Sequence, residues 1–237
     1  MAFNGTITFK GVASSNYALT ITTPPSIIHP ELFTEEYTIP GKDGTLYGVS
    51  PYRGSAQIIV TMALVKKGFT NNVAEYIKEY RRVRSWLQGT GKLKIGDAPD
   101  SYYEVQKVSI SGDERTVVQY GTIQVTFVVY PYEFLDSGDT GVTNTSITND
   151  ADICAPLYKI VGNGSGTLTV NSKTMTYTVA GTLYIDTRRY IAYDGSNANK
   201  SNVVAGDYDD LKLIHGSNSV SATAGTLTVY PKWGYVL

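Results

Sequence analysis

Cysteine and histidine are scarce in this 237-residue chain, and no catalytic motif accompanies them. Cys154 is the only cysteine, which excludes an intrachain disulfide and a metal cluster held by several thiolates. His29 and His215 are far apart in the sequence, and no G-x-S-x-G, H-E-x-x-H or phosphate-loop motif occurs. We therefore expect no catalytic, metal-binding or cofactor-binding residues, and no cofactor.

Charge and long apolar runs are also limited. Charged residues make up 17% of the chain, the net charge is −1 and the pI is about 6.1, whereas duplex-binding domains are usually basic. No stretch of about 18 apolar residues is present, so we expect no membrane insertion. The opening MAFNGTITFKG lacks the basic-then-apolar pattern of a signal peptide, which favours synthesis without secretion.

Tyrosine and glycine are abundant instead, with 19 and 23 copies against three methionines. This composition favours strands joined by tight turns. Apolar residues alternate with polar ones around Ile7 and Phe9, and again around Leu19 and Ile21, as in half-buried strands. A mainly β fold is the prediction.

One segment has the periodicity of a helix. Asn72 and Glu75 suit its N-terminus, and Gly89 suits the left-handed position that ends a helix. The apolar residues predicted to form its buried stripe are Val73, Ile77, Tyr80, Val83 and Leu87.

Two polar segments interrupt the apolar patterns. Residues 24–55 are rich in proline and glycine and contain a Lys42-Asp43-Gly44 turn, which predicts a long excursion, such as a hairpin arm. Residues 136–150 are poor in apolar side chains and predict a linker. The predicted domains are therefore 1–135, with the helix and the arm, and 136–237, a β-sandwich of short strands.

A family resemblance rests on the segment from RRVRSWLQGTG to VTFVVYPYEF. Its order is Trp-Leu, a short strand, Tyr-Tyr, an alternating strand and then V-T-F-x-x-x-P-Y. The residues concerned are Trp86, Leu87, Tyr102, Tyr103, Gly121, Val125, Thr126, Phe127, Pro131 and Tyr132. This pattern resembles the N-terminal domain of siphophage distal tail (Dit) proteins. The opening FNGTITFKGV and the later PLYKIVGNGSGTLTV also fit that family.

The resemblance implies a structural, non-enzymatic virion protein at the phage tail tip, made in the host cytoplasm. It implies a tail-tube-like N-terminal domain in a homo-hexameric baseplate hub ring, and a galectin-like or jelly-roll C-terminal domain. The implied partners are the tail-tube protein, a tail-associated tip protein that leads to host adhesion, and receptor-binding proteins. DNA would be met only in passage through the channel.

Candidate interface residues come from three places: the arm, the basic end of the helix, and the Tyr-Tyr hairpin. They are Tyr47, Arg53, Arg81, Arg82, Arg84, Tyr102 and Tyr103. The family resemblance implies that the arm packs on a neighbouring subunit. An ordinary surface loop and a solvated arginine face remain the alternatives.

A second function stays open, that of a carbohydrate-binding module for host glycans. Tyr190, Tyr193 and Trp233 are the candidate sugar-stacking residues. An acidic cluster, Asp207, Asp209 and Asp210, is near them in sequence. It is interpreted as a surface loop, with a calcium site or a carboxylate pair for glycoside hydrolysis as alternatives.

Overall fold

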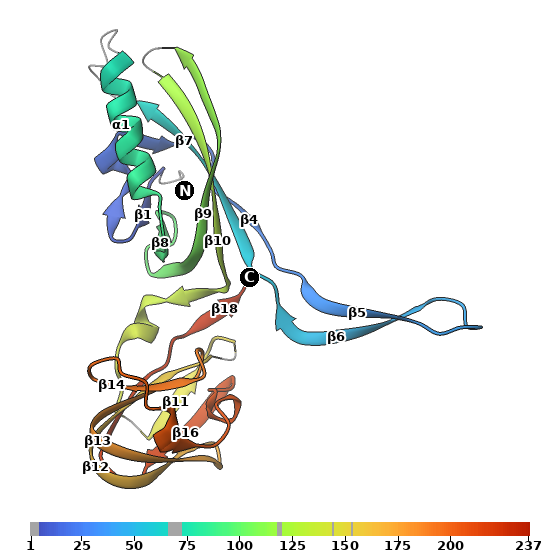
Figure 1. Ribbon diagram of the computed structural model, residues 1–237, viewed down its shortest axis with the longest axis vertical. Helices are drawn as coiled ribbons and strands as arrows, with labels where there is room; N and C mark the ends of the chain where they lie inside the picture. Colours follow the sequence, from blue (N-terminus) through green and yellow to red (C-terminus); the bar gives the residue numbers. More distant parts are fainter. Residues whose placement is uncertain (1–4, 66–72, 118–119, 144, 153) are drawn as a thin grey trace. The chain divides into compact units, whose positions relative to one another are not determined.

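The computed structural model describes residues 5–65, 73–117, 120–143, 145–152 and 154–237, and it confirms a mainly β fold with one α-helix (Figure 1). The chain divides into two compact units. Unit 1 comprises Met1–Glu133 with Leu237, and unit 2 comprises Phe134–Val236. None of the helical segments in the described ranges is long and apolar enough to span a bilayer.

Unit 1 contains most of the long strands and the helix. Its elements are β1 (Ile7–Phe9), β2 (Val12–Ala13), η1 (Ser14–Tyr17), β3 (Leu19–Ile21), β4 (Ser26–Ile28), β5 (Leu32–Thr38), β6 (Thr45–Arg53), β7 (Ala56–Val65), α1 (Val73–Trp86), β8 (Gly91–Ile95), β9 (Ser101–Val117) and β10 (Tyr120–Leu135), the last of which runs on into unit 2. The main sheet has the order β2-β1-β8-β9-β10-β7-β3, and β4 also pairs with β7.

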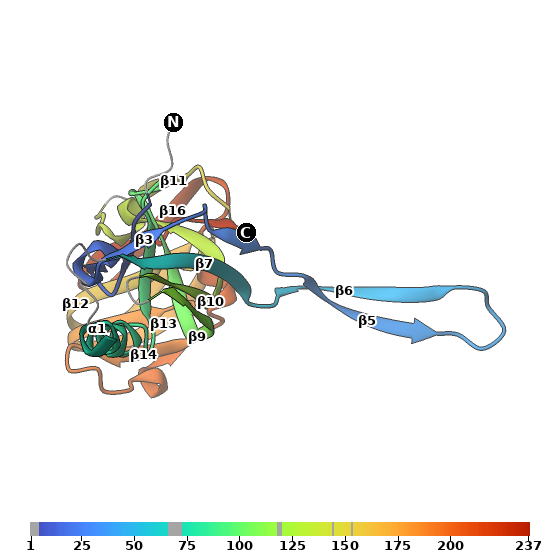
Figure 2. The same ribbon diagram turned by 90° about the horizontal axis from the view of Figure 1, so that it is seen from above.

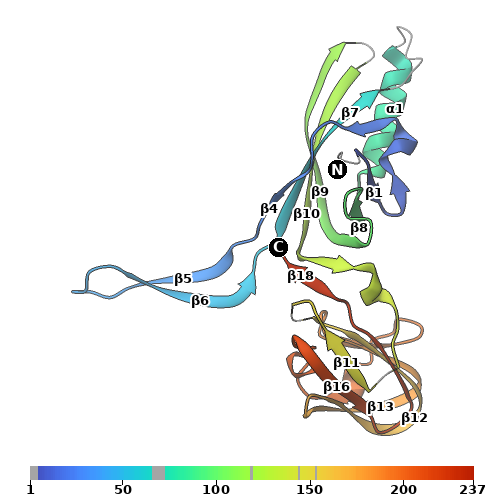
Figure 3. The same ribbon diagram turned by 180° about the vertical axis from the view of Figure 1, so that it is seen from behind.

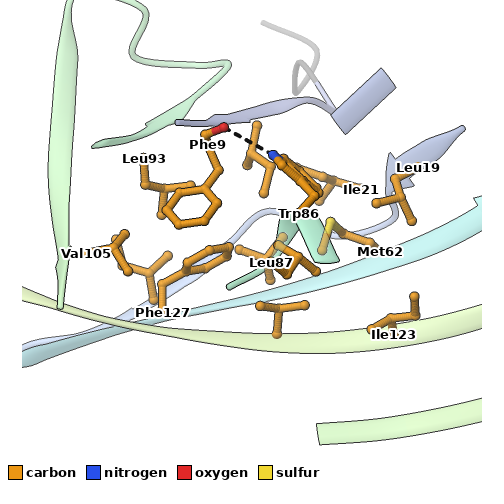
Figure 4. Packing of buried hydrophobic residues seen from close by; sticks show 14 of the residues in the cluster. Phe9, Leu19, Ile21, Met62, Trp86, Leu87, Leu93, Val105, Ile123 and Phe127 are labelled. Atoms are coloured by element: carbon orange, nitrogen blue, oxygen red, sulfur yellow. Dashed lines mark hydrogen bonds between the residues drawn. The ribbon is translucent and has the colours of Figure 1, made fainter. Parts of the chain in front are cut away.

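The core of unit 1 lies on one face of this sheet. Alternation along the antiparallel β7–β10 pair puts Val60, Val125 and Phe127 on that face, where all three are fully buried. The helix closes the core through Trp86, whose Nε1 donates a hydrogen bond to the Phe9 carbonyl oxygen at 3.1 Å (Figure 4). The Phe9 ring contacts both Trp86 and Phe127 edge-on.

The helix is rotated relative to the predicted stripe. Its buried residues are Tyr76, Glu79, Val83 and Trp86, whereas Val73 and Ile77 are each 39% exposed. The prediction was therefore wrong for Val73 and Ile77, because the larger Tyr76 and Trp86 rings take the core positions at the same helical spacing. The predicted left-handed glycine is confirmed, since Gly89 has φ of 77°. The predicted cap, Asn72, is outside the described residues.

The predicted excursion is a two-stranded antiparallel hairpin, here called the arm, formed by β5 and β6 (Figure 2). Its base is closed by a hydrogen bond from Gly54 N to the Glu31 carbonyl oxygen at 3.1 Å. The strands before and after it, β4 and β7, pair with each other. The arm is thus inserted between two strands that are neighbours in the main sheet.

Unit 2 is built around one long hairpin (Figure 3). Its elements are η2 (Asp136–Asp139), β11 (Ser146–Asn149), β12 (Leu157–Val170), β13 (Lys173–Asp186), β14 (Ile191–Asp194), η3 (Ser201–Val203), β15 (Val204–Ala205), η4 (Asp209–Leu211), β16 (Gly216–Ala222), β17 (Thr226–Tyr230) and β18 (Gly234–Val236). The sheet order is β11-β16-β12-β13-β14, with β15 on β13 and β17 on β12.

The β12 strand of the long hairpin pairs with two different strands of unit 2 along its length. The first part of β12 pairs with β17, and its last three residues pair with β16. Between these parts, Gly164 (φ 121°) and Gly181 (φ 88°) adopt backbone conformations that favour glycine, which allows the strands to bend. The curled sheet encloses a core that includes Tyr158, Ile160, Met175 and Ile185. This is the expected sandwich-like C-terminal domain.

A glycine in the family-like motif gives a test of the unit 1 core. A Cβ on Gly121 would lie 2.0 Å from the Tyr76 hydroxyl oxygen. We expect Gly121→Ala to lower the free energy of unfolding of unit 1 by about 1–3 kcal/mol, because overpacking forces neighbouring groups to shift. Urea unfolding followed by Trp86 fluorescence, in a Trp233→Phe background, reports on unit 1.

Gly54→Ala is the matched control, because the nearest atom to its added Cβ would be at an ordinary 3.9 Å. Equal stability of the two variants would contradict the assigned packing of Tyr76 on β10.

Candidate assembly surfaces

The arm presents apolar side chains on both of its faces. The register pairs Glu36 with Tyr47 and Thr34 with Val49, so these four share one face, here called the Tyr47 face. Tyr37 pairs with Leu46 on the opposite face, where the Tyr37 ring lies against Gly48. Tyr47 is 61% exposed and Val49 is 62% exposed.

Exposure of this kind leaves the arm without a core of its own. Phe33, Tyr37, Leu46 and Tyr52 are also exposed, and an isolated hairpin is only marginally stable in water. Contiguous apolar surface on a protein marks an interaction site. The sequence analysis singled out Tyr47 but missed its exposed neighbours, although large apolar residues recur among the polar ones on both sides of the Lys42-Asp43-Gly44 turn.

Arg53 lies at the base of the arm, half-buried and opposite Leu32 in the register. It directly follows the exposed Tyr52, at the last residue of β6.

The three helix arginines have different surroundings. Arg82 donates from Nη1 to both oxygens of the buried Glu79, at 2.7 and 3.0 Å, and its guanidinium lies 5.6 Å from the centre of the Tyr17 ring. Arg84 is exposed and lies 5.9 Å from the centre of the Tyr80 ring. Arg81 is exposed too. Arg82 is thus bound within unit 1, while Arg81 and Arg84 lie on its surface.

Tyr102 and Tyr103 are both buried, and Tyr103 belongs to the core of unit 1. Tyr102 is fully buried, with the Lys92 ammonium 3.8 Å from its ring centre, and Tyr103 is 4% exposed. Burial, together with the Glu133 carboxylate, raises the pKa of Tyr103 to about 12. In this conformation neither side chain is available to another subunit, and we leave both out of the assembly surface.

The three aromatic residues proposed for sugar stacking lie in different surroundings. Tyr193 stacks on Tyr184 at 5.0 Å, on the sheet face opposite the core residues Ala192 and Ile185. Trp233 packs against that core. Tyr190, with φ of 54°, donates from its hydroxyl to Asp209 at 2.7 Å. The residues therefore form no common stacking platform.

The carboxylates of Asp207, Asp209 and Asp210 each have a local partner. Asp209 pairs with Lys212 at 2.5 Å, Asp210 pairs with Lys173 at 3.3 Å, and Asp207 accepts a hydrogen bond from the Asp209 backbone. Lys212 and the Tyr190 hydroxyl lower the pKa of Asp209. Among the described residues no three His, Cys, Asp or Glu side chains gather as a metal site would require.

Unit 2 also has an open groove of about 610 Å³, lined mainly by hydroxyl-bearing residues of β12 and β13. Several of these hydroxyls are already bonded within the unit. Ser165 bonds Thr178 at 3.0 Å, and Thr223 accepts from the Thr167 backbone at 2.8 Å. The groove lining contains no carboxylate or histidine.

The different roles of the helix arginines can be measured. Arg82→Ala should lower the free energy of unfolding of unit 1 by about 1–2 kcal/mol, since it leaves a buried carboxylate without its cation while the arginine itself is half exposed. Arg84→Ala should change it by about 0.5 kcal/mol or less. Urea unfolding compares the two, and an equal loss in both would refute the distinction.

Comparison with known proteins was made at the levels of sequence and fold. No protein-family model and no curated protein matches the sequence. Among solved structures, the Dit protein of phage SPP1, described as a paradigm of the hub adsorption apparatus in phages that infect Gram-positive bacteria, matches over 100% of both chains with a TM-score of 0.61 and 13% identity.

Two structures of the phage p2 baseplate in its activated conformation match less well. They give TM-scores of 0.46 and 0.44 at 9% identity, over 94% of this chain and 95% and 92% of theirs. The likeness to the SPP1 protein confirms, at the level of fold, the predicted resemblance to distal tail proteins.

Proposed function

We propose that this protein is a structural component of a phage tail tip, a distal tail hub that joins the tail tube to the host-adhesion apparatus. The observation that carries the proposal is the likeness in fold to the SPP1 hub protein along the whole of both chains. A likeness that includes the arm-bearing unit and the C-terminal unit favours a hub over a tail-tube subunit. The carbohydrate-binding alternative has no assembled aromatic platform to support it.

The hub role requires copies of the chain to associate, and unit 1 carries the surface for it. We infer a closed ring, with six copies as the family resemblance implies, in which the arm is covered by other protein. In a ring with closed cyclic symmetry, every arm would be covered and none would stay exposed. Tail-tube protein, tip protein and receptor-binding protein are the further partners that this role calls for.

The sheet face opposite the core suits a channel through which DNA passes. Along β7 and β10 it carries Gln57, Thr61, Thr122, Gln124 and Thr126, all at least partly exposed and uncharged. Phosphate contacts from lysine and arginine dominate the affinity of proteins for DNA. On β8 the same face carries Lys92 and Lys94, which alternate with the buried Leu93 and Ile95, so the uncharged region is limited to β7 and β10. Such a region would let DNA slide past as a passing partner rather than bind it as a ligand.

Removal of the arm tests the proposal. Because Gly54 N is bonded to the Glu31 carbonyl, a short Gly-Ser linker can replace residues 32–53 without strain at the base. We expect the wild-type chain to form rings, and the armless chain to stay folded and monomeric. Light scattering gives the mass, and negative-stain images show the rings.

A chain with Lys42→Ala and Asp43→Ala at the exposed tip of the arm is the control, and it should assemble normally. If the armless chain formed rings of unchanged stability, the arm would not be part of the assembly surface. A wild-type chain that neither forms rings nor joins tail components would contradict the hub role itself.

A further inference from the structure

The helix α1 has a second, exposed stripe besides the one that faces the core. Val73, Ile77, Arg81 and Arg84 lie within an arc of about 80° around the helix axis, since each residue turns it by about 100°. Two partly exposed apolar side chains are thus followed by two exposed arginines on the same side. Among the described residues, the contact recorded for this combination, here called the α1 stripe, is that of Arg84 with the Tyr80 ring.

Neither arginine of the stripe has a carboxylate partner among the described residues. The nearby Arg82 does, because it is bound to Glu79. A fixed pair of cations beside apolar surface, with no acid of its own, is a surface suited to an acidic and apolar partner.

The Tyr47 face of the arm has the complementary character. Glu36 lies directly opposite Tyr47 and next to Val49 on the adjacent strand, and all three are exposed. Glu36 has no cationic partner in the described chain, whereas Glu35 on the other face accepts the hydroxyl hydrogen of Tyr37. The arm as a whole, residues 32–53, carries three acidic side chains and two basic ones, while α1 carries four basic and two acidic.

We propose that the Tyr47 face of one copy docks on the α1 stripe of a second copy, with Tyr47 on Ile77 and Glu36 beside Arg81 and Arg84. This inference rests on the proposed function, because it assigns the two sides of one subunit contact in the ring. It adds to the ring a specific partner surface for the arm.

The dimensions of the two surfaces agree when the arm crosses the helix. Residues paired across the two strands, such as Glu36 and Tyr47, are separated by about 5 Å. Residues four apart on a helix, such as Ile77 and Arg81, are separated by about 6 Å along the axis. One apolar contact, Tyr47 on Ile77, and one charged contact, Glu36 with Arg81, can therefore form together.

Chain connectivity favours a second copy over the same chain. The arm joins the N-terminal end of β7, and the segment that leads to α1 leaves from its C-terminal end. The ten residues of β7 span about 33 Å, so the base of the arm and the start of α1 are at opposite ends of this strand.

Charge reversal tests the pairing. Glu36→Arg and Arg84→Glu should each raise the concentration needed for assembly by about tenfold, because a favourable contact becomes a repulsive one. The double variant should regain most of this loss. Lys78→Glu, which has the same charge change on another side of α1, should assemble as the wild type does. Light scattering across a concentration series gives the concentration needed for assembly of each of the four variants, for comparison with the wild type.

Cross-linking between introduced cysteines detects the contact even when complete rings do not form. A Tyr47→Cys chain is mixed with an Ile77→Cys chain and treated with a short bismaleimide. The mixed dimer should form at least tenfold faster than in a mixture of Tyr47→Cys with Lys78→Cys. The native Cys154 should not interfere, since burial raises the pKa of its thiol to about 11 and leaves little reactive thiolate at neutral pH.

The outcomes separate this inference from the hub role. Normal rings in both reversal variants, or single losses that the double variant does not regain, would overturn the arm–helix pairing and leave the hub role standing. Equal cross-linking at Ile77 and Lys78 would overturn the pairing as well. Rings that the armless chain cannot form, together with rescue by the double reversal, would support both.

Discussion

The structure depends on the fact that a two-stranded hairpin cannot bury either of its own faces. The arm is closed at its base by the Gly54–Glu31 hydrogen bond and held by two paired strands, but beyond the base its apolar side chains stay in solvent. Burial of such side chains is the main favourable term in protein association. An arm with these exposed apolar side chains is therefore expected to hold a single conformation mainly when another protein buries them.

The packing of the unit 1 core explains why α1 has an exposed apolar and basic stripe. Phe9, Trp86 and Phe127 form the aromatic centre of the core, and the Trp86 hydrogen bond to the Phe9 carbonyl fixes the end of α1 against the sheet. Fixing that end also fixes the rotation of the helix. Tyr76 and Val83 then face inward, and Val73 and Ile77 must face outward beside Arg81 and Arg84. The exposed stripe is thus a consequence of how the core is packed.

Local patterns predicted much of this fold, and their failures have a common physical cause. The β class, the hairpin excursion and the left-handed Gly89 follow from alternation and turn residues, which act within a few residues of the chain. The rotation of α1 does not, because Val73 and Ile77 fit the same helical period as Tyr76 and Val83. Which stripe is buried depends on the volumes that face it across the sheet.

The same limit applies to the candidate site residues. Tyr102 and Tyr103 carry polar tips and look suited to an interface, yet both are buried, and Tyr103 lies in the core of unit 1 near Glu133. Tyr193 and Trp233 are both aromatic and lie in one unit, yet strand register puts one on the outer face and packs the other on the core. Residue type alone does not reveal the face, because face is set by pairing with distant strands.

The two units differ in how their exposed apolar residues are distributed and in whether their charged side chains are bonded locally. In unit 2 the acidic side chains of the Asp207–Asp210 segment are bonded locally, and its large exposed apolar residues, Val161, Tyr190, Ile214 and Tyr235, are scattered along the sequence. In unit 1 the exposed apolar residues are concentrated in the arm and on α1. Scattered exposure is normal for a folded domain, whereas concentrated exposure beside unpaired charge is characteristic of a surface that another chain covers. The concentrated exposed apolar surface therefore lies in unit 1 rather than in unit 2.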